Sequence, residues 1–226
     1  MWPSAVVLSQ WLLTNPSVVR GKRVLEIGAG CGLTGLVAAR LQKHYAKECS
    51  DNHNNHTDPL MLSDGKRQHQ EVILSDFNTT VLQNLERNIA LNNVETGCSV
   101  VGLDFYEQSG AASQWKDMNG VEREQVDVIL AADMICQPAD AVGAANTIHD
   151  ALLPGGRAIV VCADSEHRFG VEIFESECRR VGLEITARDV GDMYEGKLYS
   201  SGGMEQTAGY VEGMSLTMFF IEKALQ

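Results

Sequence analysis

The sequence predicts an α/β fold: a doubly wound, Rossmann-like seven-stranded sheet, mostly parallel, with an antiparallel last strand. Three observations predict it. Short apolar runs alternate with segments of helical periodicity, as a parallel sheet with crossover helices requires. Glycines follow the first apolar run at Gly28, Gly30 and Gly32, where the chain passes from strand to helix. The last two strands are joined by residues 191–213, which show no helical stripe, and this connection allows the final strand to reverse direction.

The first half of the chain contains three of the seven predicted strands. The run KRVLEI is mostly apolar after its first two residues and is followed by glycines, as is typical of a strand buried on both faces of a parallel sheet. Val81, Leu82, Leu85 and Ile89 recur at helical spacing and form one apolar stripe. The predicted elements are, in order, a helix at 6–13, a strand at 22–27, a helix at 33–41, a strand at 71–75, a helix at 78–92 and a strand at 98–103.

The second half supplies the other four strands. Pro154, Gly155 and Gly156 form a helix stop ahead of the apolar run RAIVVCA. The predicted elements are a strand at 126–131, a helix at 138–153, a strand at 157–163, a helix at 169–181, and strands at 184–190 and 214–222.

Residues 42–69 stand apart because they are polar and show no apolar period. We expect a single domain over residues 1–226, with a disordered insertion at 42–69. Four of the six histidines lie in this segment: His44, His53, His56 and His69. No cysteine or carboxylate spacing accompanies them, so we expect a solvated loop and no metal site.

Charge and composition limit the partners and the cellular compartment that we expect for this protein. Lys plus Arg is 18 and Asp plus Glu is 30, giving a net charge of −12. Such a chain repels phosphate backbones, which argues against a nucleic-acid partner and favours a cationic one. No run reaches the roughly 18 apolar residues of a membrane helix, and the start lacks a signal-peptide pattern. Six scattered cysteines fit a reducing compartment, so we expect the chain in the cytoplasm or the nucleus. We also expect a monomer.

The glycine turn is the first motif with a chemical meaning. Its spacing is G-x-G-x-G, and Leu33 stands where a dinucleotide-binding turn has its third glycine. Glu26 precedes the turn, and an acidic residue there suits a ligand that carries an ammonium group and no phosphate. S-adenosylmethionine is such a ligand. A tight strand-to-helix turn without a ligand is the alternative.

Two further motifs follow the second and third strands. Asp76, which is followed by Phe77, stands where a carboxylate accepts the hydroxyl groups of a ribose. Asp104 and Phe105 are suited to an adenine, through a hydrogen bond to its amino group and contact with its ring. The alternatives are a helix cap at Asp76, and a loop carboxylate with a core ring at Asp104 and Phe105.

Asp133 ends the fourth predicted strand, directly after Ala132. If the strand order is 3-2-1-4-5, the first and fourth strands flank the point where the order reverses, and ligands bind beyond their carboxyl ends. Asp133 would then face the reacting atoms. Capping of the next helix is the alternative role.

Taken together, these motifs resemble the class I seven-strand S-adenosylmethionine-dependent methyltransferases. A closer resemblance, to the methyltransferase-like protein-lysine methyltransferases, rests on WPSA at 2–5 and VLEIGAGCGLTG at 24–35. LSDFN at 74–78 and LERNIALN at 85–92 are similar to the same family's second strand and helix. The family includes enzymes that act on calmodulin, molecular chaperones and elongation factors.

The resemblance implies a protein substrate with a target lysine, S-adenosylmethionine as cofactor, and Asp133 as the residue that orients the amine. It implies cofactor contacts at Trp2, Gly28, Ala29, Gly30, Asp76, Phe105 and Ala132. Two positions depart from the family pattern, which has Trp at Phe105 and Tyr at Cys136. A methyltransferase for small molecules and a cofactor-binding module without catalysis therefore stay open.

Overall fold

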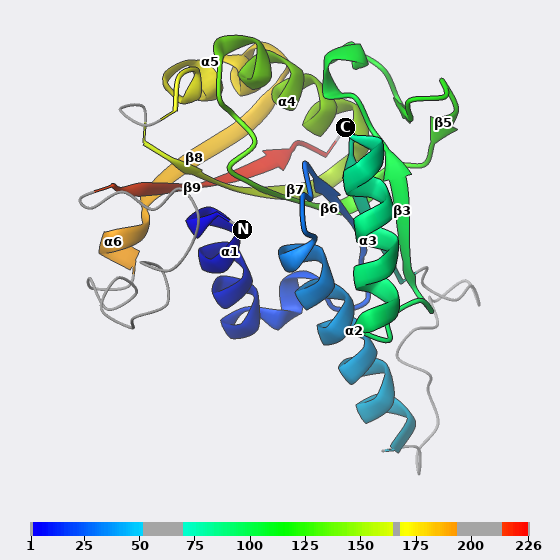
Figure 1. Cartoon of the computed structure of the whole chain (residues 1–226). Helices are drawn as coiled ribbons and strands as arrows, with labels where there is room; N and C mark the ends of the chain where they lie inside the picture. Colours follow the sequence, from blue (N-terminus) through cyan, green and yellow to red (C-terminus); the bar gives the residue numbers. More distant parts are fainter. Residues whose placement is uncertain (1, 52–69, 165–167, 194–213, 226) are drawn as a thin grey trace.

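The computed structural model describes residues 2–51, 70–164, 168–193 and 214–225. Seven strands form one sheet in the order β3-β2-β1-β6-β7-β9-β8, and helices cover both of its faces (Figure 1). The strands are β1 (Arg23–Ile27), β2 (Glu71–Asp76), β3 (Cys98–Gly102), β6 (Val126–Ala132), β7 (Leu152–Ala163), β8 (Leu183–Asp189) and β9 (Leu216–Lys223). The helices are α1 (Pro3–Thr14), α2 (Leu33–Asp51), α3 (Thr79–Leu91), α4 (Pro138–Ala151), α5 (Val171–Arg180) and α6 (Val190–Met193), with the 3-10 turns η1 (Pro16–Val18) and η2 (Phe105–Glu107).

The predicted fold class is confirmed, including the reversal of the last strand. β1 pairs in parallel with β2 and β6, so that Leu25 lies between Ile73 and Ile129. β9 is antiparallel to both of its neighbours, β7 and β8. The order changes direction between β1 and β6, as expected from the predicted order of the first five strands.

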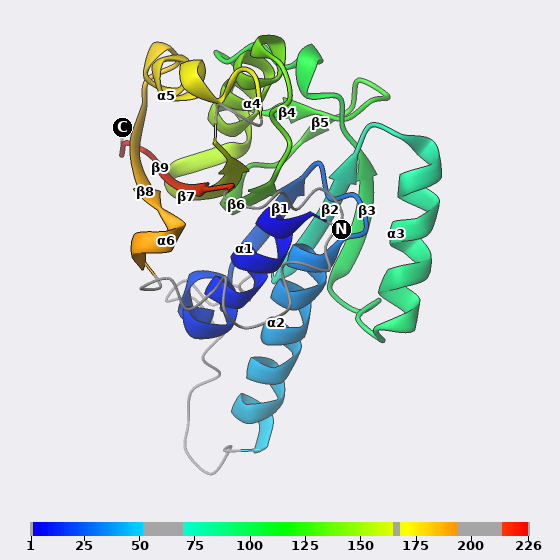
Figure 2. The same cartoon turned by 60° about the vertical axis from the view of Figure 1, so that its left-hand side comes forward.

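Two hydrophobic cores form, one on each face of the sheet. α1 and α2 lie side by side on one face together with α3, and α4 and α5 cover the other (Figure 2). The consecutive residues Phe219 and Phe220 of β9 reach opposite cores, because side chains alternate along a strand. Phe219 meets the ring of Phe174 edge-on at 5.3 Å, and Phe220 meets Trp11 at 5.6 Å.

Several boundaries differ from the sequence-based expectation. α2 continues to Asp51, well past the predicted end at residue 41, so the start of the expected insertion is helical. Residues 52–69, which hold the rest of that insertion, lie outside the described residues, as do residues 194–213 of the predicted non-helical connection. That connection begins with the short helix α6. A hairpin of β4 (Trp115–Lys116) and β5 (Glu122–Arg123) was not predicted, because each of its strands is only two residues long.

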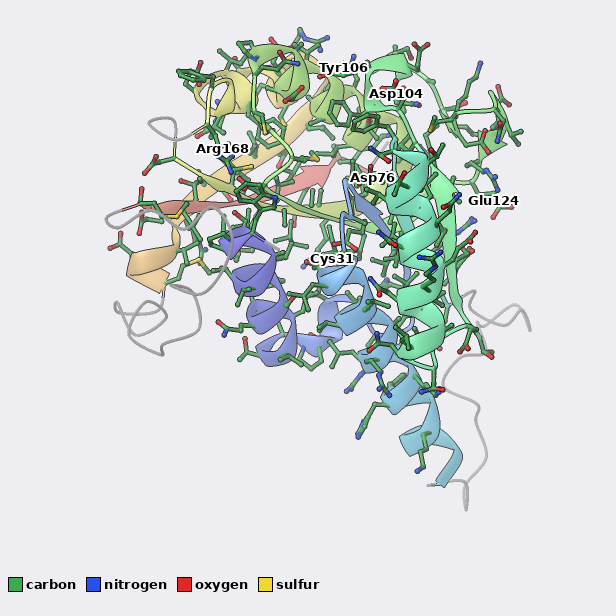
Figure 3. All side chains as sticks on the ribbon, in the orientation of Figure 1. Cys31, Asp76, Asp104, Tyr106, Glu124 and Arg168 are labelled. Atoms are coloured by element: carbon green, nitrogen blue, oxygen red, sulfur yellow. The ribbon has the colours of Figure 1, made fainter. Side chains whose placement is uncertain are left out.

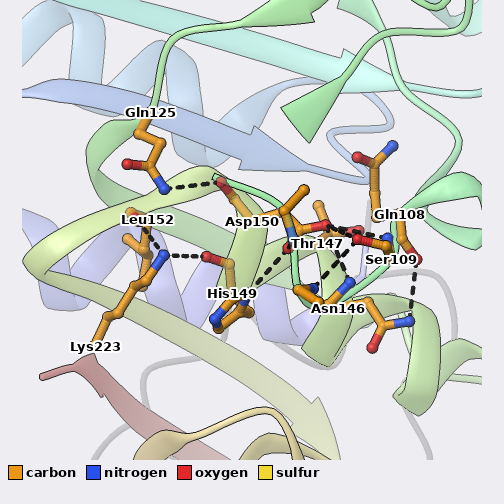
Figure 4. Close-up of polar contacts among 12 residues, drawn as sticks. Gln108, Ser109, Gln125, Asn146, Thr147, His149, Asp150, Leu152 and Lys223 are labelled. Carbon is orange, nitrogen blue, oxygen red and sulfur yellow. Dashed lines mark hydrogen bonds and ion pairs between the residues drawn. The ribbon is translucent and has the colours of Figure 1, made fainter. Parts of the chain in front are cut away.

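A buried polar network holds the edge of the sheet where the parallel strands begin (Figure 4). The Asp150 carboxylate, at the end of α4, accepts hydrogen bonds from the backbone N–H groups of Ser109, Gly110 and Ala112 at 2.9 to 3.1 Å. Lys223 Nζ donates to the carbonyl oxygens of His149 and Leu152. A cavity of about 580 Å³ beside this network is lined by none of the predicted site residues. Among the described helices, none is long and apolar enough to cross a bilayer.

Candidate functional site

The glycine turn lies between β1 and α2, at the carboxyl end of the central strand. Gly28, Gly30 and Gly32 have φ of +64°, +54° and +80°, a region that residues with a Cβ rarely adopt. The Ala29 N–H donates to the Ser75 carbonyl at 2.8 Å and ties the turn to β2. Apart from its chain neighbours, no atom of the described residues would lie within 4 Å of a Cβ added at Gly30. The backbone at Gly30 is therefore open on the side where a ligand can approach.

Glu26 supports this turn from the protein interior. Its side chain is buried, and Oε2 accepts a hydrogen bond from the Gly35 N–H at 2.9 Å, in the first turn of α2. Burial raises the pKa of Glu26 to about 8, against the hydrogen bond from the Gly35 N–H, which favours the charged form. The predicted cofactor residue Glu26 thus contacts the start of α2 directly.

Glu26 also makes the free energy of unfolding depend on pH. The pKa of Glu26 is about 8 in the folded chain and 4.5 in the unfolded chain. Between these two pH values the native chain keeps a proton that the unfolded chain releases. This contribution to stability is complete below pH 4.5 and is lost as the pH rises to about 8, a change of roughly 4 kcal/mol. The variant Glu26→Gln has no ionisable group at this position. As the pH rises from 4.5 to 8, its free energy of unfolding should therefore increase relative to that of the native chain. Urea unfolding of both proteins at pH 5 and pH 8 measures the difference, and parallel pH curves would contradict it.

Asp76 lies opposite the open glycine. Its Oδ2 accepts a hydrogen bond from the Gly30 N–H at 3.2 Å, and its Oδ1 accepts one from Asn78 N at 3.0 Å. The helix-capping alternative belongs to Asn78, whose side chain accepts from the first turn of α3. Phe77, the next residue, is 63% exposed. The structure therefore brings a half-buried carboxylate and an exposed ring to the glycine turn.

The residues after β3 form a second part of the same edge. Asp104 caps η2 by accepting a hydrogen bond from Tyr106 N at 2.9 Å. The half-buried ring of Phe105 packs against Gly143 of α4 so closely that a Cβ there would lie 2.5 Å from its Cδ2. The ring of the exposed Tyr106 lies against that of Phe105, tilted by 57° with centroids 4.7 Å apart, and the Tyr106 hydroxyl donates to Asp140.

This tyrosine was not predicted as a site residue. Gln137 Nε2 donates to the Tyr106 hydroxyl at 3.0 Å, which brings an aromatic ring beside the residue that follows Cys136. The hydrogen bond to Asp140 raises the pKa of Tyr106. An aromatic side chain thus reaches the start of α4 from the loop after β3.

Asp133 follows β6 in a strained conformation. Its φ is +56°, and its N–H donates to the Val161 carbonyl at 2.8 Å. Residues other than glycine adopt such a φ at a cost, and the surrounding structure must hold them there. Ala132, the preceding residue, is the last of β6. The strained position lies at the end of the strand next to β1, where the sheet order reverses.

Arg168, from the segment after β7, binds the Asp133 carboxylate through two hydrogen bonds. Arg168 Nε lies 3.0 Å from Oδ1, and Nη2 lies 2.6 Å from Oδ2. The Arg168 guanidinium also lies over the ring of Trp2, with Cζ 5.0 Å from the ring centroid. The sequence did not predict Arg168, because its segment is polar and carries no motif. Its place just after a strand adjacent to β6 was the available signal.

The predicted residues therefore gather at one edge of the sheet (Figure 3). Four neighbouring strands, β3, β2, β1 and β6, bring their carboxyl ends to this edge. The glycine turn follows β1, Asp76 is the last residue of β2, Asp104 comes shortly after β3, and Asp133 comes directly after β6. Trp2 reaches this edge through its contact with Arg168. Among the described residues, no group of three or more His, Cys, Asp or Glu side chains has the arrangement of a metal site.

Comparisons with known proteins show the family and the fold of the chain. A family model described as lysine methyltransferase matches residues 1–176. The human protein-lysine N-methyltransferase EEF2KMT is 27% identical over 61% of this chain and 35% of its own length. The Xenopus laevis histone-arginine methyltransferase METTL23 is 31% identical over 62% of this chain and 45% of its own length. The matched region thus covers between about a third and about half of the length of these two relatives.

Solved structures resemble the chain over nearly its whole length. A TehB-like SAM-dependent methyltransferase from Corynebacterium glutamicum superposes with a TM-score of 0.56, covering 99% of this chain and 88% of that one. The two sequences are only 14% identical, so the likeness shows a shared fold and nothing further.

Proposed function

The chain belongs to the lysine methyltransferase family, and we propose that it is an S-adenosylmethionine-dependent enzyme that methylates the side-chain amine of a lysine in a protein. One observation carries the proposal. Asp76 accepts a hydrogen bond from the Gly30 N–H, so a partly exposed carboxylate stands directly beside a glycine whose open side is filled by no atom of the part of the chain that the structure describes. A nucleoside with two free hydroxyl groups fits that pair of features.

The residues present fit the cofactor. In our proposal the backbone of the glycine turn and of Ala132 lies against it, Asp76 accepts hydrogen bonds from the ribose hydroxyls, and Asp104 and Phe105 contact the adenine. Phe77 and Trp2 present exposed rings at the same edge. When bound, S-adenosylmethionine supplies a sulfonium methyl group that can be passed to an amine. Glu26 acts on the cofactor through the turn that it supports.

The chain's own contribution to the reaction is to bind and orient the acceptor. A lysine with a pKa of about 10.4 is almost fully protonated at pH 7, and freeing its lone pair costs about 4.6 kcal/mol. We propose that Asp133 accepts a hydrogen bond from the amine and fixes its direction. The strained backbone of Asp133 supports such a role, because strain of this kind gathers at functional positions.

The proposal extends to the partner and the compartment. A net charge of −12 favours a lysine-rich protein segment and disfavours nucleic acid. We propose a monomer in the cytoplasm or the nucleus, where cysteines such as Cys31 and Cys136, which are exposed, stay reduced.

Methyl transfer to protein is tested with radiolabelled S-adenosylmethionine and cell extract. The purified chain should place label in a protein band, and mass spectrometry of that band should locate it on lysine. Asp76→Ala serves as the background control, because it should not bind the cofactor. Label on arginine, or only in the small-molecule fraction, would contradict the proposal. Cofactor binding without transfer to any extract would favour the non-catalytic module.

A further inference from the structure

The ion pair between Asp133 and Arg168 changes what Asp133 can offer an acceptor amine. Both oxygens of the carboxylate are engaged, at 3.0 and 2.6 Å, by the two nitrogens of one guanidinium edge. The Asp133 side chain is 2% exposed and the Arg168 side chain 18%. A paired fork of this kind is among the stronger polar contacts in proteins, and removing one partner from a buried pair is costly.

Arg168 is held in place from two other directions. Its N–H donates to the Asp164 carbonyl at 2.9 Å, and the Asp164 carboxylate accepts hydrogen bonds from Ser215 N and Oγ at 3.0 and 2.7 Å. The face of its guanidinium lies over the Trp2 ring. The pair is therefore a fixed part of the sheet edge.

Two thiols lie close to both partners of the pair. Among the described residues, Cys136 and Cys162, the latter on β7, interact electrostatically with both Asp133 and Arg168, and burial raises the pKa of each thiol, so both stay uncharged at neutral pH. Asp140, on α4, interacts with Cys136 and binds the Tyr106 hydroxyl. Within the pair itself, the charges of Asp133 and Arg168 offset each other.

A lone carboxylate beside a lysine would stabilise the ammonium form, which cannot accept a methyl group. We propose that Arg168 is a positioning residue that cancels the charge of Asp133, so that the acceptor lysine meets the carboxylate as a neutral amine. This inference rests on the proposed function, because it concerns the acceptor of that reaction. It also accounts for the fixed direction of the Asp133 side chain, since the two-point contact with Arg168 sets the plane of its carboxylate.

Arg168→Met tests the inference, because it removes the cation and keeps an unbranched apolar stem. With a lysine peptide as acceptor, we expect kcat at pH 7 to fall about tenfold and to recover as the pH rises, so that the midpoint of the pH profile moves up by about one unit. KM should not increase. The double variant Asp133→Asn, Arg168→Met should return the midpoint toward its original pH. An activity loss that is equal at every pH would overturn the inference.

A binding measurement separates this result from the fate of the proposed function. The probe is n-butylamine, which has the end of a lysine side chain, titrated calorimetrically at pH 7 into the protein without cofactor. Arg168→Met should bind it at least about tenfold more tightly than the native chain, while n-butanol binding should not change. Arg168→Lys, which keeps the charge, should behave as the native chain. Equal binding by all three proteins would overturn the inference, whether or not methyl transfer to lysine is observed.

Discussion

Replacing Asp76 with alanine is expected to lower the affinity for S-adenosylmethionine about a hundredfold or more. The carboxylate stands beside the open Gly30 and is proposed to accept two ribose hydroxyls. Each hydrogen bond to a charged group contributes about 1.5 to 3 kcal/mol, so losing both exceeds the roughly 2.7 kcal/mol that a hundredfold change represents. Calorimetric titration with S-adenosylmethionine or with its demethylated product measures the effect.

Asn78→Ala is the matched control for this variant. Asn78 caps α3 by accepting hydrogen bonds from Thr80 N and Val81 N, so its loss should cost about 1 kcal/mol of stability and leave the affinity unchanged. Asp76→Asn should give an intermediate affinity, because it retains one acceptor oxygen. If Asp76→Ala binds the cofactor as the native chain does, the assignment of the site is wrong.

A methyl group added at Gly35 is expected to destabilise the fold by about 3 kcal/mol. Its Cβ would lie 2.0 Å from Leu74 Cδ2 and 2.6 Å from Glu26 Oε2, and both neighbours are buried. The gain of about 1 kcal/mol from replacing a helical glycine is smaller than this clash. Urea unfolding of Gly35→Ala against the native chain measures the loss.

Gly30→Ala should give the opposite pattern. Beyond its chain neighbours, its Cβ would meet no atom within 4 Å among the described residues, so the cost is limited to about 1 kcal/mol for a positive φ. The same methyl group would stand in the space proposed for the cofactor, and we expect affinity to fall while the fold persists. Gly30→Ala with unchanged affinity, or Gly35→Ala with unchanged stability, would contradict this contrast.

The sequence predicts the sheet well where one local pattern determines one strand. The apolar run that ends at Ile27 is followed by glycines at positions that the structure gives a positive φ, so both the strand and the turn could be predicted. Asp76 and Asp133 were identified as candidates because the carboxyl ends of neighbouring parallel strands meet at one edge. Their roles toward a ligand remain predictions.

Other features depend on contacts between distant residues. Arg168 meets Asp133 across 35 positions, and Tyr106 meets Asp140 across 34, and no local pattern encodes either pair. The extension of α2 to Asp51 was missed because its polar residues leave no apolar stripe to mark it. The hydrogen bond between Glu26 and Gly35 could not be predicted either. An acidic residue before a glycine turn can bind a ligand, or it can accept a hydrogen bond from the first turn of the following helix.

The position of β9 has a consequence for how the chain matures. β9 follows β8 in the sequence, yet it lies between β7 and β8, and β8 pairs with no other strand in the described part of the sheet. During synthesis β8 therefore leaves the ribosome before the strand that will join it to the sheet. Until residues 216–223 emerge, β7 and β8 both expose unpaired edges that can join other chains. The nascent chain therefore keeps these two strand edges open to other chains until β9 has left the ribosome and inserted between them.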